Sequence, residues 1–355
     1  MARKELGINI ADFRRGKTQN IQKHDSRGPR LLIARKERKT MKKYQTTLSI
    51  GIQPSPEFNK KGLAQFAINV GTKCGHDCLY CSTGSLLRMH RSFEAAGESP
   101  FGFGYSIVDP DTPERVARDA SQMRNRGLIQ LCTTVDAWAP EAQEHNLGRR
   151  CLEAILNQSE WEVRILTKNA AVQQDYDLIR KHRDRVLVGL SLTATPSRAN
   201  QMAVVEPNAS TITQRLAALR KAHRLGLRTY GMLCPLLPGI ADDHDSISEL
   251  VGACMECGAE EFFVEPVNAR GAGLKLTQEA LLAAGFEQEA AAIGRIRSRV
   301  NWSHYCAGLI ATVQQAMQEF GVLGKLRFLL YPSHLTDADR RRIRRNDAGV
   351  KWLGN

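Results

Sequence analysis

Short apolar segments alternate with longer amphipathic segments through the middle of the chain. The apolar segments are close to continuous runs of Val, Ile, Leu and Phe, which is typical of strands buried on both faces of a parallel sheet. Six such strands are predicted, at Gln65–Val70, Leu128–Val135, Val163–Thr167, Val186–Leu192, Thr229–Leu233 and Glu261–Val267. We therefore expect an α/β fold built around one parallel sheet.

The segments between these strands have the periodicity and the end signals of helices. Five helices are predicted, over Thr112–Asn125, Leu147–Asn157, Val172–His182, Ser210–Leu225 and Asp245–Cys257. The first begins with Thr112-Pro113, and Gly226 follows the fourth at a position that glycine commonly occupies. Alternating strands and helices of this length form right-handed βαβ units, although counting them does not distinguish six units from eight.

The two ends of the chain depart from this pattern. Residues 1–50 have weak periodicity and many charges, and they are predicted to form a basic N-terminal arm. Residues 273–355 are mostly helical in pattern, with one more apolar run at Leu326–Tyr331. The predicted organisation is an arm, an α/β domain over residues 51–272 and a mostly helical C-terminal extension.

Positive charge is concentrated at the two ends. The formal net charge is +13, and residues 1–43 contain 14 Lys or Arg against four Asp or Glu. A second basic cluster spans Arg340–Arg345 near the C-terminus. Such clusters favour an anionic partner, with nucleic acid as the leading candidate, although a solvated tail without a specific partner has the same composition.

Composition argues against several other classes of protein. No apolar run approaches the roughly 18 residues of a membrane helix, and the first residues lack the apolar core of a secretory signal. Nine cysteines are an odd number, and 355 residues can build a core without disulfides. Cys254 and Cys257 lie in a predicted helix and are interpreted as packed core residues. We expect a cytoplasmic protein with no membrane contact and no disulfide framework.

Three cysteines lie within eight residues, directly after the first predicted strand. Cys74, Cys78 and Cys81 have the spacing C-x3-C-x2-C. Thiolates are ligands for zinc and for iron–sulfur clusters. A structural zinc site needs a fourth ligand at comparable spacing, and neither His76 nor His90 is an obvious one. Three ligands from one short loop can instead hold three corners of a cubane, which leaves one iron open for a substrate or cofactor.

Tyr80 directly precedes Cys81, the last of these cysteines. With an aromatic residue at this position, the motif resembles the C-x3-C-x-aromatic-C signature of the radical S-adenosylmethionine (SAM) superfamily. The resemblance implies a partial (β/α)6 barrel of the TIM type, a 4Fe–4S cluster on Cys74, Cys78 and Cys81, and SAM bound at the open iron. It also implies an enzyme that takes an electron from an external donor of the flavodoxin or ferredoxin type. Reductive cleavage of SAM would then yield a 5′-deoxyadenosyl radical that abstracts hydrogen from a substrate.

Several later segments resemble the spore photoproduct lyase branch of that superfamily, which contains repair-type enzymes. In chain order they are Leu131–Glu141 (LCTTVDAWAPE), Ile165–Lys168 (ILTK), Gly189–Thr193 (GLSLT), Glu206-Pro207 followed by Arg215-Leu216 and Leu219, and Cys234–Gly239 (CPLLPG). This resemblance implies a nucleic-acid substrate. It also implies SAM-binding roles for a set of residues near the strand ends: Tyr80, Asp136, Lys168, Ser191 and Thr193. For Lys168 and Ser191 the alternatives are a solvent-directed lysine and a serine bonded to backbone.

Cys132 is the candidate catalytic residue. In the spore lyase a cysteine in this region returns a hydrogen atom to the product radical, and the resemblance implies that role for Cys132. However, Cys132 stands four residues before Asp136, where the lyase pattern has three. A slip of one residue would turn its side chain to the other face of a continuing strand. The alternative is an ordinary buried core cysteine.

The leading hypothesis is a radical SAM enzyme that acts on nucleic acid. Radical modification of a peptide, a tRNA or a small metabolite is the alternative among enzymes. A non-catalytic, zinc-bearing nucleic-acid-binding protein is the alternative from another class.

Overall fold

The computed structural model describes residues 41–269 and 271–354, so the predicted basic arm lies outside the described residues apart from its last ten positions. The main sheet has nine strands in the order β12-β11-β10-β9-β8-β7-β6-β3-β2. Their bounds are β2 Gln53–Pro54, β3 Phe66–Ile68, β6 Leu128–Leu131, β7 Glu162–Thr167, β8 Val186–Leu190, β9 Arg228–Leu236, β10 Ala259–Pro266, β11 Leu326–Leu330 and β12 Val350–Trp352.

Every neighbouring pair from β3 to β12 is parallel, and only β2 pairs antiparallel, with β3. All six predicted strands are present, which confirms an α/β fold of the partial TIM-barrel type. The sheet also continues beyond them, because β11 and β12 come from the C-terminal extension. The division at residue 272 stays a prediction, and the sheet runs across it.

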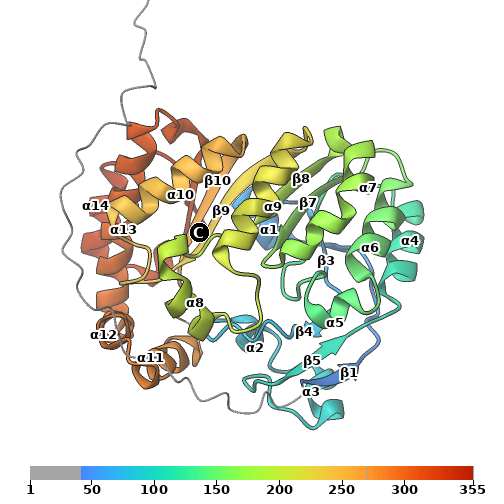
Figure 1. Cartoon of the computed structure of the whole chain (residues 1–355), viewed down its shortest axis with the longest axis horizontal. Coiled ribbons are helices and arrows are strands. Elements are labelled where there is room, and N and C mark those ends of the chain that lie inside the picture. The colour runs from blue at the N-terminus through green and yellow to red at the C-terminus, as the bar shows by residue number, and fades with distance from the viewer. Residues whose placement is uncertain (1–40, 270, 355) are drawn as a thin grey trace, which may run out of the picture. The chain divides into compact units, whose positions relative to one another are not determined.

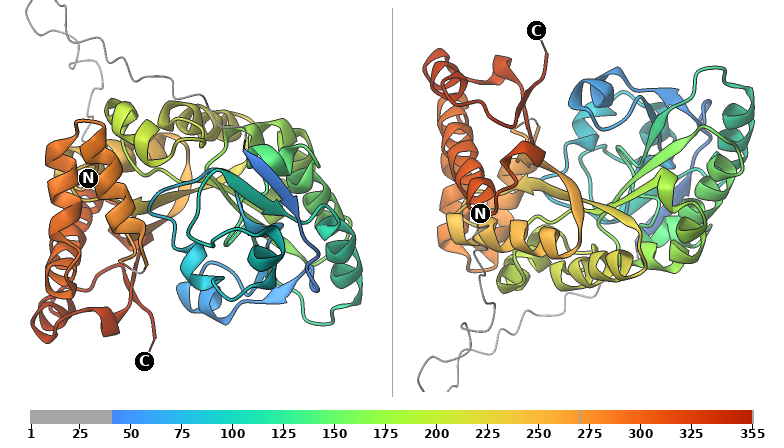
Figure 2. Two further views of the ribbon diagram at one scale, coloured as in Figure 1. Left: turned by 90° about the horizontal axis from the view of Figure 1, so that it is seen from below. Right: turned by 90° about the horizontal axis from the view of Figure 1, so that it is seen from above.

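Helices connect consecutive parallel strands and cover the sheet (Figures 1 and 2). Four of the five predicted helices form nearly as expected, and the one predicted at Val172–His182 splits into a 3₁₀ helix, Ala170–Asp175, followed by α7. The bounds are α1 Pro56–Lys61, α2 Thr83–Leu86, α3 Arg91–Ala96, α4 Thr112–Gln122, α5 Pro140–Gln143, α6 Leu147–Leu156, α7 Tyr176–Lys181, α8 Ala199–Val205, α9 Ile212–Arg224, α10 His244–Glu256, α11 Gly273–Ala283, α12 Glu287–Arg295, α13 Arg299–Glu319 and α14 Asp337–Arg344.

Buried aromatic side chains tie the first helices to the sheet. Trp161 is fully buried at the start of β7, with its ring edge-to-face on Phe66 of β3 at a centroid distance of 5.3 Å. Its indole Nε1 donates to the carbonyl of Ala120 in α4 at 3.0 Å, so the polar atom of this large ring is satisfied. One side chain thus connects two strands and a covering helix.

Local signals set the helix ends. At α9, the Thr211 hydroxyl accepts from the amide of Gln214, and the Gln214 side chain accepts from the amide of Thr211. This reciprocal cap satisfies two amides that have no partner within the helix and contributes about 1 kcal/mol. It places α9 so that its buried face, which includes Arg215, packs against the sheet.

A small second sheet was not predicted. It consists of β1 Lys42–Gln45, β5 Tyr105–Val108 and β4 Gly71–Lys73, in the order β1-β5-β4. In Figure 1 its strands lie with α2 and α3, at the lower side of the view. Because β4 leads directly into Cys74, this sheet positions the cysteine loop.

Among the described residues, the structure has no helix that is both long and apolar enough to cross a membrane.

Candidate active site

A cavity of about 190 Å³ lies at the carboxyl ends of the parallel strands. This edge is where barrel and open α/β folds place their sites. The cavity is lined by the three motif cysteines and by five of the six other predicted site residues: Cys74, Cys78, Cys81, Tyr80, Cys132, Asp136, Lys168 and Ser191. Residues from β4 to β8 therefore converge on one place, although they are spread over more than a hundred positions of the chain.

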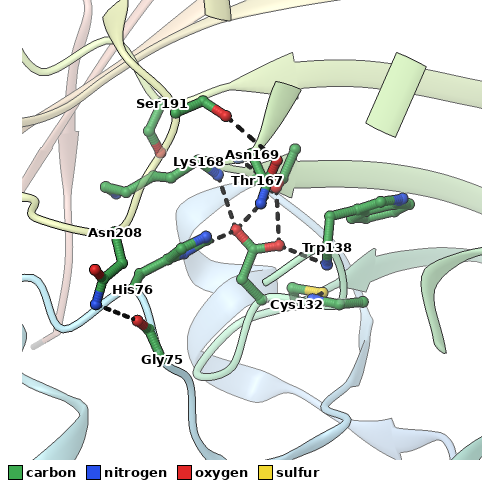
Figure 3. A network of polar contacts seen from close by, with 12 residues as sticks. Gly75, His76, Cys132, Trp138, Thr167, Lys168, Asn169, Ser191 and Asn208 are labelled. Atoms are coloured by element: carbon green, nitrogen blue, oxygen red, sulfur yellow. Dashed lines mark hydrogen bonds and ion pairs between the residues drawn. The ribbon is translucent and has the colours of Figure 1, made fainter. Parts of the chain in front are cut away.

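The cysteine loop is held from two sides. The backbone amide of Gly75 donates to Glu141 Oε1 at 2.7 Å, and its carbonyl accepts from Asn208 Nδ2 at 2.9 Å (Figure 3). A Cβ at Gly75 would overlap Met41 Sδ and lie 2.7 Å from Glu141 Oε2, so both side chains would have to shift. The two hydrogen bonds hold the loop against the segments that contain Glu141 and Asn208.

Burial favours the neutral thiol at two cysteines of this loop, Cys74 and Cys78. Burial raises the pKa of Cys74 to about 12 and raises the pKa of Cys78 well above its usual value. Thiolates in such a place need a cation beside them, and bound metal supplies one. The donor set and its surroundings therefore fit a metal centre.

Asp136 connects the cysteine loop to the ends of β6 and β7. Its carboxylate accepts from the hydroxyl of Thr167 and the amide of Lys168, both at 2.8 Å, and from the amide of Trp138 at 2.9 Å. His76 Nδ1 lies 3.5 Å from the same carboxylate. Figure 3 shows these groups converging on one side chain. Asp136 thus acts on the cavity through the groups that it positions.

His76 presents an unsatisfied atom at the cavity. Its ring is 2% exposed, and Nε2 has no hydrogen-bond partner among the described residues. Burial lowers the pKa of His76, so the ring is neutral at pH 7. A buried polar atom without a partner is costly, and a bound ligand at this cavity would remove that cost.

Lys168 keeps its charge inside the cavity. Burial opposes the charged form, but the carboxylate of Glu206 favours it, and the pKa of the ammonium is raised. Lys168 Nζ lies 5.8 Å from the centroid of the Tyr80 ring, and within the described part of the chain it makes no ion pair. It can therefore bind a carboxylate.

Glu206 and Arg215, which the sequence placed in a segment that resembles the lyase branch, form a buried network whose contacts were not predicted. Glu206 accepts from the Tyr80 hydroxyl and forms an ion pair with Arg215, and both members of that pair are about 1% exposed. Burial disfavours a charged Glu206, but Arg215 and Lys168 outweigh it and hold the pKa of the carboxyl below its usual value. Arg215 also donates to the carbonyl of Ser191 at 2.9 Å. The network joins the cysteine loop, the end of β8 and α9.

Thr193 does not line the cavity. Its hydroxyl donates to Glu206 Oε1 at 3.2 Å, so the side chain belongs to the buried network. Ser191, two residues earlier, does line the cavity. A continuing strand would place both on one face, but β8 ends at Leu190.

Cys132 lines the cavity because the predicted second strand ends early. The strand was expected to run to Val135, but β6 ends at Leu131 and Cys132 has a left-handed backbone with φ of 75°. Its sulfur accepts from the amide of Ala137 at 2.9 Å. The one-residue slip relative to Asp136 therefore does not turn this side chain away. Burial raises the pKa of the Cys132 thiol well above its usual value, so it carries its hydrogen at pH 7.

The C-terminal extension also contributes to the wall. Gly273 at the start of α11 lines the cavity, and a Cβ there would lie 2.8 Å from the carbonyl oxygen of Tyr80. Phe101 and Phe103, from the segment before β5, line the cavity as well. No local pattern in the sequence indicated these contributions, since they depend on contacts between distant segments.

The Radical SAM superfamily model matches residues 68–251. An uncharacterized protein of Acidianus two-tailed virus is 23% identical over 224 residues, which cover 61% of this chain and 71% of that protein. An uncharacterized protein of Methanocaldococcus jannaschii is 24% identical over 186 residues (52% of this chain, 66% of that protein). An uncharacterized protein of Mycobacterium tuberculosis H37Rv is 23% identical over 209 residues, which cover 58% of this chain and 60% of that protein. The chain thus spans about 60 to 70% of the length of these relatives.

Solved structures share the fold. Spore photoproduct lyase complexed with dinucleoside spore photoproduct matches with a TM-score of 0.54 at 15% identity, covering 78% of this chain and 79% of that one. A mutant of that lyase with bound AdoMet and the same dinucleoside matches with a TM-score of 0.53 at 14% identity, covering 78% of each chain. At this level of identity the likeness establishes the architecture.

Proposed function

Because the chain belongs to the radical SAM superfamily, whose model matches just over half of its length, we propose that it cleaves SAM at a 4Fe–4S cluster and acts on nucleic acid. One observation supports this proposal most directly. The three motif cysteines line the same cavity as Lys168 and Ser191. When bound, the cluster would supply the electron that cleaves SAM to methionine and a 5′-deoxyadenosyl radical.

The chemistry of the donors supports a cluster. Cys74, Cys78 and Cys81 come from one short loop and line one cavity. Three thiolates can hold three corners of a cubane, which leaves the fourth iron open for SAM.

Each polar residue of the cavity has a role in this proposal. Lys168 binds the SAM carboxylate through its ammonium, and the Ser191 hydroxyl donates a hydrogen bond to the same ligand. The ring of Tyr80 forms part of the wall, and its hydroxyl is anchored on Glu206. Thr193 acts through Glu206, and Asp136 through the amides and the imidazole that it holds.

Cys132 returns a hydrogen atom in this proposal. Its S–H bond breaks as a C–H bond forms on the product radical, and the sulfur is left as a thiyl radical. That radical regains hydrogen by one of two routes. In the first, 5′-deoxyadenosine gives up a hydrogen atom, and the deoxyadenosyl radical so formed would recombine with methionine to SAM and return one electron to the centre that supplied it. In the second, the thiyl radical takes one electron from the external donor and a proton. SAM consumption per turnover distinguishes the two routes.

Three observations support nucleic acid as the substrate class. The chain is strongly basic, with a formal charge of +13. Its fold is shared with spore photoproduct lyase, one structure of which holds a dinucleoside lesion. The cavity is also flanked by exposed aromatic side chains, Phe101 and Phe103, on which a base can stack.

The proposal is tested by anaerobic reconstitution followed by a substrate screen. We expect about four irons per chain, and 5′-deoxyadenosine on addition of dithionite and SAM. Deoxyadenosine formation should rise with DNA or RNA pools, with dinucleoside spore photoproduct as a defined probe. Zinc without iron after oxygen-free purification, or stimulation by peptides alone, would contradict the proposal.

Replacing Lys168 by methionine is expected to raise the KM for SAM by about 10- to 100-fold. The lost contact is a charge-assisted hydrogen bond to a carboxylate, which contributes about 1.5–3 kcal/mol. Iron content should stay the same, because Lys168 is not proposed as a ligand. The matched control is Lys181→Met, on an exposed position of α7. An unchanged KM in the Lys168 variant would remove this residue from the SAM site.

Replacing Cys132 by alanine is expected to separate SAM cleavage from product formation. With dinucleoside spore photoproduct as the probe, deoxyadenosine should form at the wild-type rate, while the repaired dinucleoside forms at least about tenfold more slowly, since about 1.4 kcal/mol in the barrier is tenfold in rate. Cys151→Ala is the control, because Cys151 is a fully buried thiol that does not line the cavity. Wild-type product formation by the Cys132 variant would exclude the donor role.

A further inference from the structure

A second and larger cavity adjoins the candidate active site. It has a volume of about 810 Å³ and is lined by residues 46–51, Gln53, the start of β4, Leu87 and residues 89–92. Thr133 and Thr134, which follow Cys132, line both cavities. We call this second cavity the side groove. Whatever occupies it lies next to the cavity that holds the candidate hydrogen donor.

Hydrogen bonds hold Thr133 and Thr134, which form the wall between the two cavities. Asn69, after β3, accepts from the backbone amides of Thr133 and Thr134 at 3.0 and 2.8 Å, and its Nδ2 donates to the Thr133 hydroxyl at 2.8 Å. The Thr83 hydroxyl donates to the Thr134 carbonyl at 3.2 Å. The two threonines are thus held in place as a fixed boundary that a ligand can contact from either side.

The lining of the side groove suits an anion. None of the described residues that form it carries a carboxylate, whereas Arg91, His90 and several hydroxyl groups do line it. His90 Nδ1 accepts from the amide of Ser92 at 3.3 Å, so a neutral ring carries its proton on Nε2 and can donate there. Arg91 is exposed.

Two carboxylates, Asp109 and Asp119, lie behind the lining. They accept from the backbone amides of Leu48, Gly51 and Ile52. The side chains in the lining itself are guanidinium, imidazole and hydroxyl groups, which are donors to phosphate oxygens.

An independent observation points to a ligand with apolar or aromatic parts. Of the eight large hydrophobic side chains that are exposed in the described chain, four line these two cavities: Ile50, Met89, Phe101 and Phe103. Met89 is 86% exposed and lines the side groove with Ile50, while Phe101 and Phe103 line the candidate active-site cavity. Exposed apolar side chains gathered in one place mark an interaction surface.

We propose that the side groove binds the sugar–phosphate backbone of single-stranded nucleic acid, beside the cavity where one nucleotide reacts. Arg91 and His90 contact phosphate, and the exposed apolar side chains contact the bases, the combination by which single strands are bound without sequence readout. A duplex offers its bases only after a nucleotide is extruded, so the substrate nucleotide is unpaired when it enters. This inference rests on the proposed function. It specifies that the nucleic-acid substrate is single-stranded where it binds, and that its backbone lies in the side groove.

The test measures binding of the full chain to a fluorescent single-stranded 12-nucleotide DNA at several salt concentrations. Arg91→Ala is expected to weaken binding about tenfold at low salt, as for one charge-assisted contact. It should also reduce the slope of log Kd against log salt concentration by about 0.7, the value for one phosphate on a single strand. Met89→Ala should weaken binding severalfold and leave that slope unchanged.

The control is Arg180→Ala, an exposed arginine on α7 that lines neither cavity. Equal losses for the Arg91 and Arg180 variants would overturn the proposal. Arg91-dependent binding of polyglutamate without binding of the oligonucleotide would also overturn it, in favour of a peptide. SAM cleavage without substrate is measured in parallel. The rate of this SAM cleavage should be the same in the Arg91 variant as in the wild type. If the wild type did not cleave SAM, the proposed function would be refuted, whatever the groove binds.

Discussion

Replacement of any one of Cys74, Cys78 or Cys81 by alanine is expected to lower 5′-deoxyadenosine formation by at least about a thousandfold, roughly 4 kcal/mol or more in the barrier. Each thiol is proposed to hold one corner of the cluster, and burial keeps Cys74 and Cys78 neutral unless a cation lies beside them. Loss of one ligand should therefore lower both bound iron and the cluster's visible absorption. Iron and sulfide analysis with chromatography of the reaction products measures these effects.

Cys306→Ala is the matched control for the cysteine series. Cys306 is fully buried in α13 and does not line the cavity. Its replacement should therefore lower only the free energy of unfolding. Iron content and deoxyadenosine formation should stay near the wild-type level. If the Cys78 variant kept four irons and cleaved SAM normally, the cysteine motif would not be the cluster site.

Replacement of Arg215 by methionine is expected to lower the free energy of unfolding by about 3–5 kcal/mol. The substitution leaves the carboxylate of Glu206 buried without its partner, and an uncompensated buried charge has a cost of this size. Chemical denaturation monitored by circular dichroism measures the effect. Arg220→Ala is the control on the same helix. Its pair with Glu256 is exposed, so we expect a change of less than about 1 kcal/mol.

The effect of this substitution should depend on pH. The pKa of Glu206 is held below its usual value of 4.5 in the folded protein, so the pair contributes its full stability above that value. The contribution is lost as the pH falls through the lower, folded-state pKa. The difference in stability between wild type and the Arg215 variant should therefore narrow on acidification. A difference that stays constant down to pH 3 would show that lost packing, and not charge, causes the destabilisation.

Features that depend on nearby residues were visible in the sequence. The spacing of Cys74, Cys78 and Cys81 is contained in eight residues, and the near-continuous apolar runs located all six predicted strands. Because parallel strands present their carboxyl ends at one edge, Lys168 and Ser191 could be placed together before any coordinates were known. The structure brings both to the cavity with the cysteines.

Strand periodicity failed where the backbone leaves the strand. Ser191 and Thr193 were both assigned to the SAM site from the resemblance of their segment, but β8 ends at Leu190, and the Thr193 hydroxyl bonds Glu206. Cys132 shows the opposite effect, since a left-handed residue at the end of β6 places its side chain at the cavity despite the shifted spacing. The sequence pattern contained no signal for either turn.

The sequence by itself determined the class of fold, the three-cysteine motif and the edge of the sheet where the candidate site lies. Only the tertiary structure decided what surrounds that edge: the pair of Glu206 with Arg215 behind Tyr80, the approach of Gly273 to the cysteine loop, and the side groove beside Thr133. The reason is physical. Strand and ligand patterns arise from periodicity and spacing within a few residues, whereas these contacts join segments whose separation along the chain carries no information about their separation in space.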